Sequence, residues 1–127
     1  SEDLIIYFKN AGIVHMGDLL LSQSFPATSQ DVFKYMEILR KVLEVFPESS
    51  RFISGHGKDS DFSDVKNYEK MLLNTIDIVK KGMEAGKSVE DMQKEKVLGK
   101  YESFNHFLDW LHTDYWVEAV FKNIKNR

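Results

Sequence analysis

Two residues that could bind a metal ion lie where hydrophobic strands are expected to end in loops. Asp18 follows the apolar segment 12–17, and His56 follows the segment 51–55 and has a glycine on either side. A carboxylate and an imidazole are both suitable ligands for zinc. The flanking glycines permit unusual backbone angles and close approach of another group. Two ligands are too few for a closed tetrahedral site, so the others have to come from elsewhere.

Asp18 stands between Gly17 and the three leucines 19–21, which is an unusual setting for a surface charge. A buried carboxylate without a partner costs several kcal/mol, so a cation, a network of donors or a metal is implied. Two plainer interpretations stay open. Asp18 could instead cap a nearby loop through backbone N–H groups, and His56 could be a histidine in a tight Gly-His-Gly turn.

The strands that carry these residues follow from local patterns. Residues 4–8 and 13–16 are apolar runs separated by turn-forming residues 9–12, which predicts a β-hairpin. The apolar character continues at 19–21, and residues 51–54 form another short strand. We therefore expect three strands in one small sheet.

Helices are predicted from apolar residues that recur at intervals of three and four. Four helices are expected. The first runs from 30 to 46 and is ended by Pro47, and the second runs from a cap at Asp61 or Ser63 to about 85. The third begins after a cap at Ser88, and the last begins after a cap at Thr113. Ser29 or Thr28 is the expected cap of the first helix. Residues 97–111 are less regular and rich in aromatic side chains.

The composition is that of one globular α/β domain. The chain has 127 residues, of which 43% are hydrophobic and 29% charged, and it has no cysteine. This is ordinary for a soluble protein and compatible with a cytoplasmic or an oxidising compartment. A net charge of −3 gives no bias toward nucleic acid, and no segment has the ~20 apolar residues of a membrane helix. The lysines form a solvated face without interleaved aromatic side chains: Lys80, Lys81, Lys87, Lys94 and Lys96.

The chain is expected to be part of a longer protein. It begins at Ser1 and enters its first strand at Leu4, which leaves little room for preceding structure. At least three helices carry apolar stripes, and three strands are too few to cover them all on both faces. A partner sheet is therefore expected.

The motifs Gly17-Asp18-Leu19-Leu20 and Ile53-Ser54-Gly55-His56-Gly57, each after an apolar strand, resemble the C-terminal half of metallo-β-lactamase-fold hydrolases. The tail Tyr115–Phe121 is similar to the closing helix of that family. The resemblance covers nearly all of residues 1–127. It implies an α/β fold: half of an αββα sandwich, with a small, mostly antiparallel sheet covered by three to four helices, and with the N-terminal half absent.

The resemblance also implies the chemistry of the complete enzyme. Asp18 matches the carboxylate that bridges two zinc ions, and His56 matches a ligand of the second zinc. The family's His-x-His-x-Asp-His loop is missing here, as is its further histidine, so the implied hydrolysis of an ester, amide, thioester or phosphoester by zinc-activated water needs the rest of the protein. The chain alone is expected to be inactive, and zinc occupancy in it is doubtful.

Four further residues are candidates for contact with a small-molecule substrate: Ser22, Ser24, His106 and His112. Packing in the core or on the surface is the alternative for the two histidines, and a loop that only caps the helix 30–46 is the alternative for the two serines. His15 is expected on the strand face opposite Asp18, as a hydrogen-bonded histidine and not a ligand.

The competing functional hypothesis is a non-catalytic binding module that keeps the half-fold. An apolar sheet face left open would bind the missing N-terminal half or a second copy of this chain, which predicts a homodimer or a strand-swapped oligomer. A two-fold dimer could bring two Asp18–His56 pairs together.

Overall fold

The computed structural model describes residues 5–21, 24–26, 31–56, 58–104 and 112–127. The predicted α/β class is confirmed. Within the described part, the elements are β1 (Ile6–Phe8), β2 (Ile13–Leu21), α1 (Val32–Val45), β3 (Arg51–His56), β4 (Ser60–Asp61), α2 (Phe62–Glu84), α3 (Val89–Lys94), the short 3-10 helix η1 (Gly99–Tyr101) and α4 (Thr113–Lys125). None of the described helices has both the length and the hydropathy that crossing a membrane requires.

The strands form one mixed sheet in the order β1-β2-β3-β4. The predicted hairpin is present: β1 and β2 are antiparallel, and Gly12 adopts a left-handed φ of 65° in the turn that joins them. β2 and β3 are parallel, with Val14 opposite Phe52, and β3 and β4 are antiparallel. The sheet is therefore antiparallel at its two outer pairings and parallel at its centre.

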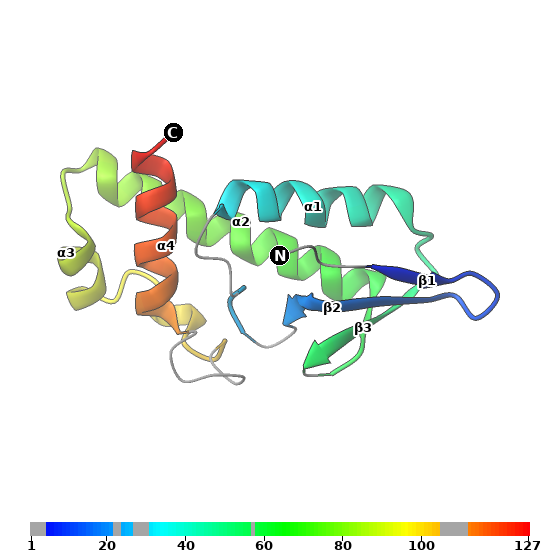
Figure 1. Ribbon diagram of the computed structural model, residues 1–127. Coiled ribbons are helices and arrows are strands. Elements are labelled where there is room, and N and C mark those ends of the chain that lie inside the picture. Colours follow the sequence, from blue (N-terminus) through cyan, green and yellow to red (C-terminus); the bar gives the residue numbers. More distant parts are fainter. Residues whose placement is uncertain (1–4, 22–23, 27–30, 57, 105–111) are drawn as a thin grey trace.

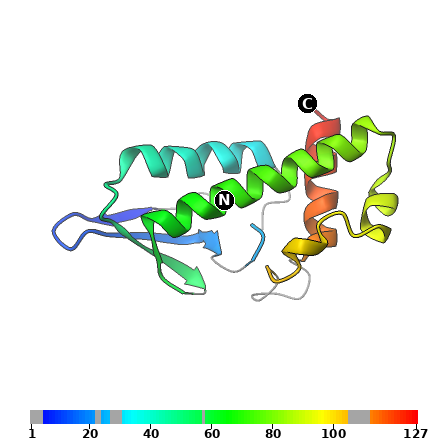
Figure 2. The ribbon, with the colours of Figure 1, turned by 180° about the vertical axis from the view of Figure 1, so that it is seen from behind.

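Helices α1 and α2 lie on the same face of this sheet, as both views show (Figures 1 and 2). Alternation along the strands buries Val14, Met16 and Phe52 beneath them. Tyr7, which pairs with Val14, contacts the ring of Phe46 at a centroid distance of 5.0 Å. This face of the sheet is the floor of the hydrophobic core.

The C-terminal part of α2 extends beyond the sheet and packs against α4, which also packs against α3 (Figure 2). Trp116 of α4 is fully buried, and its Nε1–H donates to Thr75 Oγ1 of α2 at 2.7 Å. The Trp116 ring stacks on Phe25 at 5.5 Å. Because Phe25 follows the exit of β2, this contact joins the helical end of the molecule to the strand end.

Two helix caps differ from the predicted ones. Asp31, and not Ser29 or Thr28, caps α1 by accepting from the Lys34 N–H at 2.9 Å; residues 27–30 lie outside the described part. His112, and not Thr113, caps α4, because its Nδ1 accepts from the Asp114 N–H at 3.1 Å. Thr113 is already the first residue of the helix. Asp61, one of the two residues predicted to cap α2, forms a reciprocal capping box with Asp64.

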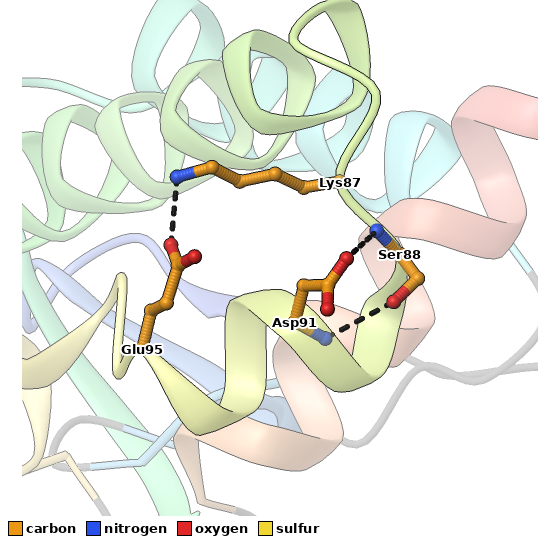
Figure 3. A network of polar contacts seen from close by, with 4 residues as sticks. All are labelled: Lys87, Ser88, Asp91 and Glu95. Atoms are coloured by element: carbon orange, nitrogen blue, oxygen red, sulfur yellow. Dashed lines mark hydrogen bonds and ion pairs between the residues drawn. The ribbon is translucent and has the colours of Figure 1, made fainter.

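Polar contacts at both ends hold the short helix α3 (Figure 3). Ser88 and Asp91 form a capping box: the Ser88 N–H donates to Asp91 Oδ2 at 3.0 Å, and the Asp91 N–H donates to Ser88 Oγ at 3.1 Å. Lys87 Nζ pairs with Glu95 at 2.7 Å. The hydrogen bonds from the Ser88 backbone and side chain hold the pKa of Asp91 below its ordinary value of 3.8.

Asp91→Asn should lower the melting temperature at neutral pH, with a loss that shrinks in acid. A carboxyl group with a depressed folded-state pKa stabilises the fold above its unfolded pKa of 3.8, and this contribution disappears as the pH falls through the depressed value. Thermal unfolding of both proteins across this range measures the difference. Glu90→Gln, on the same helix but outside the capping box, is the control. A difference for Asp91→Asn that does not change with pH would contradict the assignment.

Candidate functional site

The parallel pairing of β2 and β3 brings the backbones of Asp18 and His56 to neighbouring strands. Gly17 pairs with Ser54 and Leu21 pairs with His56, so Asp18 lies in the stretch of β2 opposite the end of β3. Parallel strands present their carboxyl ends at one edge of a sheet, where ligands bind in many α/β proteins. The side chains of Asp18 and His56 are outside the described part of the structure.

Asp18 stands in an irregular stretch of β2. From the Gly17–Ser54 pair to the Leu21–His56 pair, β2 advances by four residues and β3 by only two. A further register shift lies between His15 and Gly17. Gly17 adopts a left-handed φ of 57°, and a Cβ added there would meet no atom within 4 Å. Bulges of this kind re-aim side chains next to functional sites. The simple two-residue alternation used to place His15 and Asp18 on opposite faces is therefore interrupted between them.

His15 is hydrogen-bonded within its own strand, because its Nδ1 accepts from the Gly17 N–H at 3.3 Å. It is partly buried and pairs laterally with Ile6 and Ile53. The hydrogen bond assists the turn at Gly17, which gives His15 a local structural role.

The structure describes two of the four predicted substrate-contact residues, Ser24 and His112. Ser24 is buried, with 1% of its surface exposed, and His112 caps α4 through its imidazole. Ser22 and His106 lie outside the described residues. A contact of these four residues with substrate stays a prediction.

Sequence reasoning missed two tyrosine hydroxyls near the candidate site. Tyr35 of α1 donates to the Leu19 carbonyl at 2.7 Å, and Tyr68 of α2 donates to the Ser24 carbonyl at 2.7 Å. The periodicity that predicts the two helices accounts for these tyrosines only as members of a buried apolar face. A tyrosine on such a face was the available signal, since a buried phenol needs a hydrogen-bond partner.

Asp18 and His56 are of residue types that bind zinc, but two protein ligands are fewer than a zinc site needs. Carboxylate oxygen and imidazole nitrogen are ordinary zinc donors, and three or four protein ligands are the norm. In the ranges that the structure describes, no three His, Asp or Glu side chains come together as a metal-binding group. Asp18 and His56 can thus supply two donors of a site that needs further ligands.

Gly17→Ala should lower the free energy of unfolding by about 1–2 kcal/mol, because an L-residue is strained in the left-handed region. The open space around Gly17 makes the backbone the only source of this cost. Gly99→Ala is the matched control, since its added Cβ makes an ordinary contact with Lys96 at 3.7 Å and no left-handed φ is involved. Urea unfolding measures both. Equal stabilities of the two variants would argue against strain at Gly17.

Comparison with known proteins identifies no family: no protein-family model matches the sequence, and no curated protein matches it.

Proposed function

We propose that this chain is the C-terminal portion of a metal-dependent hydrolase of the metallo-β-lactamase fold. Asp18 and His56 are its contribution to a zinc site, and the rest of the protein supplies the remaining ligands. The observation that supports the proposal is the β2–β3 register, which places Asp18 between Gly17 and Leu21, the partners of Ser54 and His56. The spacing of the two motifs in the sequence does not by itself require this proximity.

The reaction class follows from the resemblance and from the donor set. Zinc bound at such a site supplies Lewis acidity and activates water for attack on an ester, amide, thioester or phosphoester. The role of this chain is to hold and orient two ligands on rigid strand ends. The two ligands that this chain is proposed to contribute are too few for a zinc site. The chain is therefore proposed to be inactive without its partner portion.

Zinc binding tests the proposal directly. Asp18→Ala and His56→Ala should each weaken Zn²⁺ affinity by at least about tenfold, since loss of even an outer-shell partner costs 10- to 100-fold. A titration followed by NMR measures affinity even when binding is weak. His112→Asn is the control, because it removes an imidazole while asparagine remains a good helix cap. Equal zinc binding by wild type, Asp18→Ala and His56→Ala would refute the proposed site.

A second candidate function is self-association through the sheet face opposite α1 and α2. The register places its residues in two lateral rows: Ile6, His15 and Ile53, then Phe8, Ile13 and Arg51. Ile6 is 43% exposed and Phe8 is 52% exposed. Burial of apolar surface is worth roughly 25 cal/mol per Å², which favours covering this face. The proposed occupant is a second copy of the chain, packed sheet on sheet.

Phe8→Asp should shift the chain from dimer to monomer, because it places a charge among the exposed apolar side chains of this face, on the edge strand β1. Leu73→Asp is the control, since Leu73 is 45% exposed on α2, away from the sheet face. Sedimentation velocity at high micromolar concentration gives the oligomeric state of each. A monomeric wild-type chain would rule out self-association and leave the missing portion of the sandwich as the proposed partner.

A further inference from the structure

Two side-chain hydroxyls from the helices donate hydrogen bonds to the backbone at the C-terminal end of β2 and just after it. Leu19, the neighbour of Asp18, lies in the stretch where the ladder between β2 and β3 is irregular. Its carbonyl accepts from the Tyr35 hydroxyl at 2.7 Å. A buried carbonyl needs a partner, and here a side chain from α1 supplies it.

The Tyr68 hydroxyl makes the equivalent contact further along, with the Ser24 carbonyl at 2.7 Å. Tyr35 and Tyr68 are 7% and 6% exposed, and they come from the two helices that cover the sheet. Each phenol has a single proton. A hydrogen bond also links the two hydroxyls, so the Tyr68 hydroxyl lies within reach of both the Ser24 carbonyl and the Tyr35 hydroxyl. Burial raises the pKa of both phenols, so both remain donors at any working pH.

We infer that Tyr35 and Tyr68 are positioning residues that hold the backbone after Asp18 in the geometry needed for metal binding. The inference rests on the proposed zinc site. Phenylalanine would fill the same core space, so packing alone does not require either hydroxyl. Each hydroxyl instead contacts a carbonyl of the segment between Asp18 and Phe25, from the side of the helices. The two contacts bracket residues 19–24.

The test removes one oxygen atom at a time from the full chain. Tyr35→Phe and Tyr68→Phe should each weaken Zn²⁺ affinity by about tenfold, the lower range for loss of an outer-shell contact. The amides of Asp18 and Leu19 should also exchange faster with solvent. Zn²⁺ titration and hydrogen exchange, both followed by NMR, give these two readouts.

Two controls separate positioning from general stability. Tyr101→Phe removes the same atom from a buried tyrosine in η1. Thr75→Val removes the acceptor of the buried Trp116 hydrogen bond between α2 and α4, and so destabilises the fold elsewhere. Both controls should keep Zn²⁺ affinity within about twofold of wild type, well short of the outer-shell effect.

The possible outcomes are distinct. Weaker binding by both tyrosine variants, with unchanged controls, supports the positioning role. If Asp18→Ala weakens zinc binding and the tyrosine variants do not, the positioning role is wrong and the proposed site stands. If Thr75→Val weakens binding as much as the tyrosine variants, the effect is one of stability and the inference fails. If Asp18→Ala binds zinc like wild type, the proposed site and the positioning role are both wrong.

Discussion

The parallel pairing of β2 with β3 is the constraint on which the other features of the fold depend. Parallel neighbours cannot be joined by a tight turn, so the chain has to cross over, and α1 makes that crossover. The crossover lays α1 over the strands and buries Val14 and Phe52, which are paired across them. It also carries the ends of both strands to one edge of the sheet. The candidate ligands lie on adjacent strands because of this topology, although 37 residues of chain lie between them.

The irregular register at Gly17 and the hydrogen bonds of the two tyrosine hydroxyls also depend on the parallel pairing of β2 with β3. Where β2 departs from a regular ladder, its backbone groups need other partners, and the helices that the crossover places above the sheet supply them. The long helix α2 then connects this region to the packing of Trp116 and Phe25. The opposite sheet face has apolar residues and no equivalent cover among the described helices (Figure 1). The molecule is therefore one-sided, which fits a proposed role as half of a larger sandwich or as one copy of a pair.

Local sequence patterns were sufficient for most elements and for the hairpin of β1 and β2, and insufficient for the parallel pairing of β2 with β3. The hairpin, the first two long helices and the cap at Ser88 were predicted because alternation, periodicity and capping residues act over a few positions. The two-residue strand β4 was missed, since so short a strand has no alternation to detect. Likewise, the parallel register and the contacts of Tyr35 and Tyr68 join residues far apart in the chain. Asp18 and His56 were identified by residue type and flanking glycines, and the fold was needed to show that their strands are adjacent.

The central claim is that His56 and Asp18 share a metal ion at the strand ends. Long-range ¹H–¹⁵N NMR of the histidine rings, recorded before and after addition of Zn²⁺, tests it most directly because coordination changes the shift of the ligating nitrogen. We expect a large shift at a ring nitrogen of His56 that is lost in Asp18→Ala, while the ring nitrogens of His15 and His112 keep their shifts. Zinc binding that leaves the His56 ring unchanged, or that shifts another histidine instead, would contradict it.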